Sequence, residues 1–185
     1  RNVPVVQLPA PILAYVCHDI PSEVGDCHLR DPGALVGLAG VAIAKAMMQT
    51  EIIVVDINPE KRQVALDVGA QYVVDPSELD ARKQLYKLTG GALAVVDFVG
   101  SYNTVQFAFG ALGTGGQLVV VGLYGGAANL SVPMFPLKSL TVMGSYVGSL
   151  EDMHELMAMV VAGKVDALPV SKRPLNQADV TLRDL

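Results

Sequence analysis

The sequence predicts an α/β fold, in which a doubly wound parallel sheet carries helices on both of its faces. Apolar runs of strand length alternate with helical patterns from about residue 33 onwards, which is typical of such a sheet. The chain is 51% hydrophobic and only 17% charged, and its 185 residues suit one globular domain with a large core. The 18 glycines and the many Val, Ala and Leu residues suit buried strands that helices cover closely.

The first expected helix, residues 34–48, follows a glycine-containing turn and is rich in small side chains that let it lie close to the sheet. The strand that leads into this turn is expected at residues 26–31. Arg30 and Asp31 are costly in a buried central strand unless they are paired or lie at its very end. An apolar run then predicts a second strand at residues 51–56.

The next helix, residues 59–68, has clear start and stop signals. Pro59 lies in its first turn and Gly69 comes just past its end, which is the usual asymmetry of helix termini. A short apolar run predicts a strand at residues 72–74.

A third helix is expected over residues 77–88. Ser77 is expected to cap it, with Asp80 in the place of the usual glutamate of a capping box. The remaining expected elements are a strand at 93–99, a helix at 103–112, strands at 117–121 and 140–143, a helix at 150–162 closed by Gly163, and a last helix at 176–185.

Ligands of doubly wound sheets bind beyond the carboxyl ends of the strands, where the strand order reverses. Four of the five loops expected there contain glycine. A purely structural role, in which glycine simply ends a strand, explains any one of these loops, but it explains less well why all of them lie at the same edge. These loops are residues 33–37, 56–61, 99–101, 121–123 and 144–146.

Asp56 is the most informative residue of these loops. It ends an apolar run and stands 19 residues after Gly37, a spacing that indicates dinucleotide binding. The glycines let the backbone approach a pyrophosphate at a helix N-terminus, and the carboxylate accepts hydrogen bonds from a ribose diol. A carboxylate there also repels a 2′-phosphate, so the sequence favours NAD over NADP.

Composition excludes several other classes of function. The net charge is −5 and the 13 Lys and Arg residues are scattered, which argues against nucleic-acid binding. No apolar run reaches the roughly 18 to 20 residues that cross a bilayer. Cys17-His18 and Cys27-His28 lack the usual spacing of zinc ligands, and ordinary thiols are the better interpretation. With two cysteines and no secretory signal, a cytoplasmic location is expected.

Several segments resemble the cofactor-binding domain of the medium-chain, zinc-type alcohol dehydrogenase family. The resemblance runs from about residue 33 to the end, through PGALVGLAGVAIAKAM, EIIVVDINPEKRQVALDVGAQYVVDP, VDFVGS, GGQLVVVGLYGG and LKSLTVMGSYVGS. It implies that Asp56 holds the adenosine ribose of NAD, that Lys61 lies beside it, and that the loops after the last two strands pass the nicotinamide. The expected cofactor-binding residues are Gly33, Gly37, Asp56, Lys61, Val99, Gly100, Val121, Gly122, Leu123, Ser145 and Tyr146.

The chain departs from the family pattern before Gly37. The family turn resembles G-x-G-x-x-G, but here Asp31 takes the first glycine position and one extra residue separates the later two glycines. Upstream, residues 10–15 match the segment before the cofactor domain, but the C-A-G-x-T motif with its zinc-ligand cysteine is missing. We therefore expect residues 1–25 to be a remnant linking to a missing catalytic domain, with the N-terminal part truncated, misread or rearranged, and residues 26–185 to be the NAD-binding domain.

The resemblance implies an NAD-dependent alcohol or polyol dehydrogenase acting on an alcohol or carbonyl substrate. In the family a catalytic zinc polarises the alcohol oxygen and hydride passes to the nicotinamide. No Cys, His and Glu set in this sequence replaces the zinc ligands, so we expect no catalytic residues here and no activity of the chain alone. Two alternatives remain: a non-catalytic nucleotide-binding or oligomerisation module, and a zinc-free quinone reductase using NADPH, against which Asp56 argues.

The family also forms oligomers through edge strands of this domain, so a homo-oligomer is expected. Residues 129–132 fit such an edge strand and a plain surface loop equally well.

Overall fold

The computed structural model describes residues 12–15, 32–47, 51–166 and 172–183, and it confirms the predicted doubly wound parallel sheet. Six strands form one sheet in the order β3-β2-β1-β4-β5-β6, and every neighbouring pair is parallel. The order reverses between β1 and β4. The strands are β1 (Ile12–Tyr15), β2 (Ile52–Val55), β3 (Tyr72–Val74), β4 (Ala92–Asp97), β5 (Leu112–Val120) and β6 (Thr141–Gly144).

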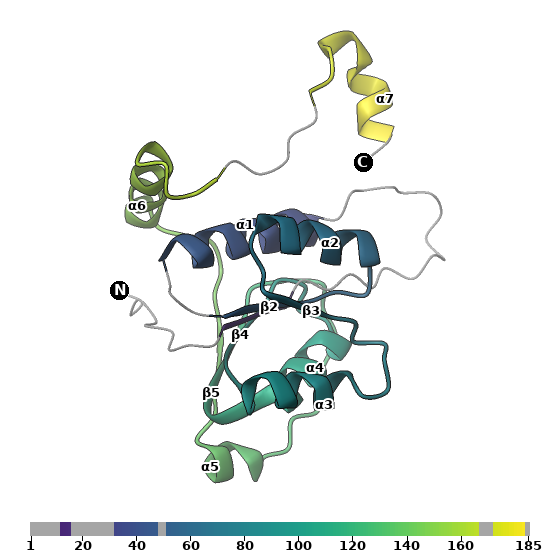
Figure 1. The fold of residues 1–185 in the computed structure, drawn as a ribbon, viewed down its shortest axis with the longest axis vertical. Helices are drawn as coiled ribbons and strands as arrows, with labels where there is room; N and C mark the ends of the chain where they lie inside the picture. Colours follow the sequence, from purple (N-terminus) through teal and green to yellow (C-terminus); the bar gives the residue numbers. More distant parts are fainter. Residues whose placement is uncertain (1–11, 16–31, 48–50, 167–171, 184–185) are drawn as a thin grey trace.

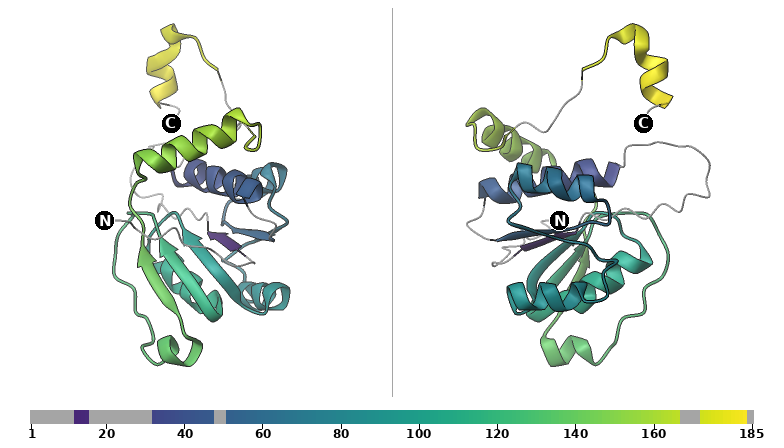
Figure 2. Two further views of the ribbon diagram at one scale, coloured as in Figure 1. Left: turned by 90° about the vertical axis from the view of Figure 1, so that its left-hand side faces the viewer. Right: turned by 45° about the vertical axis from the view of Figure 1, so that its right-hand side comes forward.

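Helices cover both faces of the sheet, as Figures 1 and 2 show. On one face lie α1 (Pro32–Met47) and α2 (Pro59–Val68), and on the other lie α3 (Ala81–Thr89) and α4 (Tyr102–Ala111). The remaining helical segments are α5 (Met134–Lys138), α6 (Leu150–Val161), the 3₁₀ turn η1 (Leu175–Gln177) and α7 (Ala178–Arg183).

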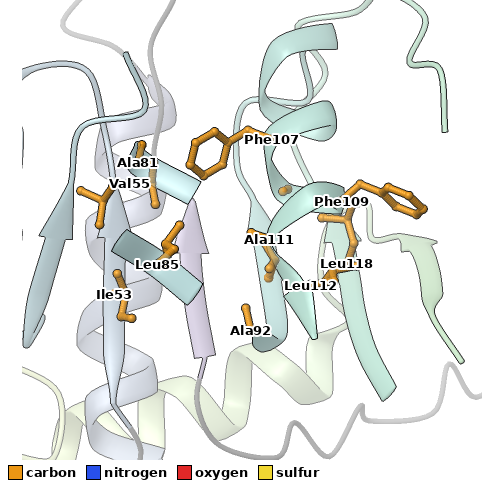
Figure 3. Close-up of a cluster of buried hydrophobic side chains, with 13 residues drawn as sticks. Ile53, Val55, Ala81, Leu85, Ala92, Phe107, Phe109, Ala111, Leu112 and Leu118 are labelled. Atoms are coloured by element: carbon orange, nitrogen blue, oxygen red, sulfur yellow. The ribbon is translucent and has the colours of Figure 1, made fainter. Parts of the chain in front are cut away.

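Strand β2 contributes to the hydrophobic core on both faces. Ile52 and Val54 pack in a cluster with residues of α1 and α2. Ile53 and Val55 pack in a larger cluster with residues of α3, α4 and β5, part of which Figure 3 shows. All four side chains are at most 1% exposed. Successive side chains alternate between the faces, so a strand with helices on both sides must be apolar throughout.

Strand β1 lies in the middle of the sheet, between β2 and β4. It precedes residue 26, at which the domain was expected to begin. Residues 12–15 were expected in a linking segment, but they pair with both β2 and β4. The apolar run Ile-Leu-Ala suits this central position in the sheet better than the charged stretch 26–31. The strand expected at 26–31 lies outside the described residues, and the domain boundary at residue 26 stays a prediction.

The start of α3 corrects the expected cap. The helix begins at Ala81 rather than at Ser77, and Asp80 makes no side-chain capping bond. Ser77 is engaged elsewhere: its backbone N and its Oγ both donate to Asp75 Oδ1, at 2.9 and 2.5 Å. Because a carboxylate two residues earlier holds this serine in a turn, the serine is not available to start a helix.

By contrast, α2 has the predicted bounds. Its first turn is capped by Asn58, whose side chain accepts from the backbone N of Glu60 and Lys61, and Gly69 ends it with φ 134°. Gly163 likewise follows α6 with φ 66°.

Strand β5 is longer at its beginning than predicted. Leu112, expected to end a helix, starts the strand, and its register with β4 shifts between Ala92 and Ala94. Between these two pairings β5 has more residues than β4, and they include Gly113 and Gly116. A side chain at Gly113 would lie 2.9 Å from the carbonyl oxygen of Gly91, so the two strands approach closely at this irregularity.

The C-terminal third contains most of the exposed large hydrophobic side chains of the described residues. Residues 129–132 form no strand within this single chain, and their role as an edge strand between subunits stays a prediction. Helix α6 has no buried residue. The helix expected over 176–185 begins at Ala178, and residues 184–185 lie outside the described part of the chain. Within the described residues, no helix has both the length and the apolar character that a membrane crossing needs.

Candidate cofactor site

The six strands end in register at one edge of the sheet, which we call the carboxyl edge. A single row of aligned residues crosses the sheet there: Val74 with Val55, Val55 with Tyr15, Tyr15 with Asp97, Asp97 with Val120, and Val120 with Gly144. Asp56, Val121 and Ser145 each come one residue after this row. The register therefore brings the loops that the sequence analysis singled out to the same edge.

The loops after β4 and β5 contact each other through glycine backbone. Gly100 has φ 69°, and a Cβ on it would lie 1.9 Å from the carbonyl oxygen of Gly122. A Cβ on Gly122 would lie 2.0 Å from the carbonyl carbon of Val99. The backbone N of Tyr124 donates to Val99 O at 3.0 Å. The two loops thus form one surface, and at their contact there is no space for a side chain on either glycine.

Asp97 organises both of these loops. Its carboxylate Oδ1 accepts from the backbone N of Val99 at 2.9 Å and of Gly100 at 3.0 Å, and Oδ2 accepts from Thr104 Oγ1 at 2.8 Å. Its carbonyl oxygen accepts from the backbone N of Val121 at 2.8 Å. The side chain is fully buried, and this burial raises its pKa, although the three hydrogen bonds act in the opposite direction.

Helix α4 begins directly beside this carboxylate. Ser101 and Thr104 form a capping box, in which each side chain bonds to the backbone N of the other residue. Sequence reasoning placed Ser101 in a candidate loop without a role, and it missed Asp97 and Thr104 as parts of the site. The available signal was an aspartate at the end of a buried strand, followed by Ser and Thr three residues apart.

Asp56 follows β2 and is fully buried. Its backbone N donates to Val74 O at 3.2 Å, and its Oδ1 accepts from the backbone N of Asn58 at 2.7 Å. Asn58 in turn caps α2, which starts with the predicted site residue Lys61 in its first turn. The carboxylate is therefore fixed to the turn that connects β2 to the next helix.

Arg62 and Asp75 also belong to this turn, and the sequence analysis did not find them. Arg62 Nη1 donates to the carbonyl oxygens of Asp56 and Ile57, at 2.7 and 3.0 Å, and to Asp75 Oδ2 at 2.9 Å. The side chains of Arg62 and Asp75 are each only 19% exposed. The pairing joins residues 13 apart in the sequence, so no local pattern indicates it.

The predicted glycine turn at residues 33–37 overlaps the first helix, which begins at Pro32, two residues earlier than expected. Gly33 and Gly37 both lie within α1, which begins at Pro32, and Gly37 is buried. Proline is favoured in the first turn of a helix because its φ is already helical and its missing N–H needs no partner there. Gly37 thus lies one turn inside the helix, in agreement with the helix expected over residues 34–48.

The loop after β6 carries the last predicted residues. Ser145 N donates to Val120 O at 2.9 Å, which ties this loop to β5. Tyr146 is 73% exposed, and Leu123, in the loop after β5, is 78% exposed. These apolar groups lie uncovered on loops that begin at the carboxyl edge.

Metal binding has no counterpart in the part of the chain that the structure describes. Among those residues, no three or more His, Cys, Asp and Glu side chains are grouped so that they could hold a metal ion. The described residues therefore do not fit a zinc site.

A model of the zinc-binding dehydrogenase family matches residues 36–162, which is more than half of the chain. The chain belongs to the zinc-binding dehydrogenase family. This finding confirms the resemblance to the cofactor-binding domain of zinc-type alcohol dehydrogenases, and the matched residues contain β2 to β6.

Relatives and solved structures agree with this membership. An NAD-dependent alcohol dehydrogenase of Sulfurisphaera tokodaii is 31% identical over 155 residues, which are 83% of this chain and 45% of that protein. The L-galactonate-5-dehydrogenase of Escherichia coli is 33% identical over 134 residues, which are 71% of this chain and 39% of that protein. The crystal structure of the Aeropyrum pernix alcohol dehydrogenase has a TM-score of 0.74 at 29% identity, over 95% of this chain and 47% of its own. The chain thus spans less than half the length of these relatives.

Proposed function

We propose that this chain is the NAD-binding part of an alcohol or polyol dehydrogenase. The observation that carries the proposal is the row of strand ends at the carboxyl edge. These strand ends bring Asp56, the Gly100–Gly122 contact and the loop of Ser145 to the same edge of the sheet. The similarity to an NAD-dependent alcohol dehydrogenase of Sulfurisphaera tokodaii supports the choice of cofactor.

Asp56 would accept hydrogen bonds from the hydroxyl groups of the adenosine ribose. Its Oδ1 accepts from Asn58 N at 2.7 Å, and the two oxygens of a carboxylate together offer about four lone-pair sites, so a carboxylate can accept several hydrogen bonds at once. Its side chain is fully buried, so a ribose reaches it only after neighbouring atoms move.

The glycine contact would provide the flat surface on which the rest of the dinucleotide lies. Any side chain at Gly100 or Gly122 would collide with backbone. The described loops offer backbone N–H and C=O groups and the exposed side chains of Leu123 and Tyr146. The nicotinamide, when bound, supplies the hydride chemistry. The residues of this chain would orient it and shield one of its faces from water.

NADH fluorescence provides the test, because the chain contains no tryptophan to interfere. We expect NADH to bind more tightly than NADPH, and Asp56→Asn to weaken NADH binding by about 10- to 100-fold. That range corresponds to the roughly 1.5–3 kcal/mol of hydrogen bonds to a charged group. Asp67→Asn is the control, since it removes the same charge from an exposed position on α2. Unchanged NADH affinity in Asp56→Asn would contradict the proposal.

The described residues include no metal site, so we propose that the chain alone does not oxidise alcohols. Incubation with NAD and simple primary and secondary alcohols should form no NADH above the blank. A protein that binds neither cofactor would instead favour the non-catalytic module, and a preference for NADPH would favour the quinone reductase. The proposal includes a homo-oligomeric assembly, which light scattering coupled to size-exclusion chromatography would test.

A further inference from the structure

The turn that holds Asp56 contains a cation whose partners are all internal to the protein. Arg62 Nη1 lies 2.7 Å from Asp56 O and 3.0 Å from Ile57 O, so the guanidinium sits at the base of the turn that carries the carboxylate. Its side chain is 19% exposed. A positive charge at this place would attract a phosphate group bound next to Asp56 unless another group neutralised it.

Asp75 is the group that neutralises this cation. It is the first residue after β3, and its Oδ2 lies 2.9 Å from Arg62 Nη1. Its other oxygen, Oδ1, accepts from the Oγ and the backbone N of Ser77, at 2.5 and 2.9 Å. The hydroxyl of Ser77 is the largest influence on the pKa of Asp75, which is lowered, with further contributions from the Ser77 backbone and from Arg62. The carboxylate therefore stays ionised and stays on the side of Arg62.

The sheet register fixes the distance between the two acids. Val74 and Val55 are aligned partners, and Asp56 N donates to Val74 O at 3.2 Å. Asp75 and Asp56 thus leave neighbouring strands side by side. Arg62 lies between the carboxylate of Asp75 and the backbone carbonyl of Asp56, so the guanidinium pairs with the charge of Asp75 and contacts Asp56 through its backbone oxygen.

We propose that Asp75 is a specificity-determining positioning residue that makes this site select a ribose with a free 2′-hydroxyl against one with a 2′-phosphate. It does so by holding the Arg62 guanidinium under the turn and by neutralising it. The inference rests on the proposed function, because it assigns a role within the same adenosine-ribose site. It differs from the role of Asp56, since Asp75 is expected to act through Arg62 without contacting the cofactor.

A merely structural role for Asp75 predicts a different result. If its only effect were to stabilise the turn, its loss would weaken the binding of both cofactors by the same factor. A change in the ratio of the two affinities therefore separates the two roles. Lys61 is a second cation near the turn, and it is unchanged in every variant compared below.

The experiment measures dissociation constants of NADH and NADPH for the full chain and for Asp75→Asn, and repeats them with 5′-AMP and 2′,5′-ADP. The two nucleotides report on the adenosine part of the site alone. We expect Asp75→Asn to shift the selectivity ratio toward the 2′-phosphate by on the order of tenfold, which is the effect of about one charge-assisted contact. The shift should shrink as salt is raised, because the charge is partly screened.

Matched variants control for overall charge and for loss of folding. Asp67→Asn carries the same charge change on the exposed surface of α2 and should leave the ratio unchanged. Arg62→Gln removes the cation and leaves Asp75, so it should shift the ratio in the opposite direction. It tests the same charge argument if Asp75→Asn does not fold.

Two failures are distinguishable. If the unmodified chain binds neither NADH nor 5′-AMP, the proposed function fails and this inference fails with it. If the unmodified chain binds NADH but the ratio stays the same in both Asp75→Asn and Arg62→Gln, the proposed function survives and the role of Asp75 is wrong.

Discussion

Replacement of Gly122 by alanine probes the contact that joins the loops after β4 and β5. The added Cβ would lie 2.0 Å from the carbonyl carbon of Val99, 2.2 Å from its oxygen and 2.5 Å from the carbonyl carbon of Phe98. Non-bonded carbon atoms prefer separations of about 3.5–4.0 Å. All three contacted atoms are backbone atoms, so no side-chain rotation can relieve the collision, and the loops must separate by roughly 1.5 Å.

The energetic cost follows from what that separation breaks. Overpacking of a well-packed region costs about 1–3 kcal/mol. The hydrogen bonds from Gly122 N to Asp97 O and from Tyr124 N to Val99 O, at 3.1 and 3.0 Å, span the contact, and each contributes about 1 kcal/mol. We expect Gly122→Ala to lower the free energy of unfolding by about 3–5 kcal/mol and to weaken NADH binding in the variant that remains folded.

Gly144, at the end of the neighbouring strand β6, offers a matched control. It is aligned with Val120 at the carboxyl edge, but a Cβ on it would meet no atom closer than Val120 O at 3.9 Å. Gly144→Ala should therefore stay within about 1 kcal/mol of the unmodified chain, since alanine also reduces the entropy of the unfolded state. Urea unfolding followed by far-ultraviolet circular dichroism measures both variants. Equal stabilities of the two variants would refute the contact.

Two further predictions concern helix caps and a buried acid. Asn58→Ala should destabilise the protein by about 0.5–2 kcal/mol in urea unfolding because it uncaps α2, whereas Asp80→Ala, which removes no capping bond, should cost less; equal costs would contradict the cap. Asp97 should make the protein more stable as the pH falls towards about 4, because its folded pKa lies above its usual 3.8 and the folded state therefore takes up the proton first. Unfolding free energies at pH 7 and at about pH 4 should show that this component is absent in Asp97→Asn, and an identical pH dependence would contradict it.

The parts of the fold that could be predicted depend on local signals. The bounds of α2 follow from Pro59 and Gly69, which act within their own turn, and the apolar run of β2 follows from burial on both faces. The start of α3 could not be predicted in this way. Ser77 looks like a cap in the sequence, but Asp75 binds it in the structure.

The candidate site was predictable as a set of loops but not as a set of contacts. The glycines and Asp56 follow strand ends, and strand ends of a parallel sheet meet at one edge, so their common location follows from the sequence. The close contact between Gly100 and Gly122 and the pairing of Arg62 with Asp75 join distant segments, and only the register of the sheet brings them together. The position of β1 was not predicted, because the strand was expected in the charged stretch 26–31. The apolar segment Ile12–Tyr15 forms a strand that pairs with β2 and β4.

The irregularity between β4 and β5 has a consequence for how this domain can change in length. The additional residues of β5 are accommodated at the amino end of the strand, between the pairings of Ala92 and Ala94, and beyond that point the two strands run in step to Asp97 and Val120. An insertion at the amino end can thus be absorbed without moving any ligand-facing loop. The same insertion next to Val120 would displace its loop by one residue, about 3.3 Å, and turn alternate side chains to the opposite face. Insertions at the amino ends of these strands are therefore expected to be tolerated. Insertions at the carboxyl edge, where the candidate cofactor site lies, are expected to abolish cofactor binding.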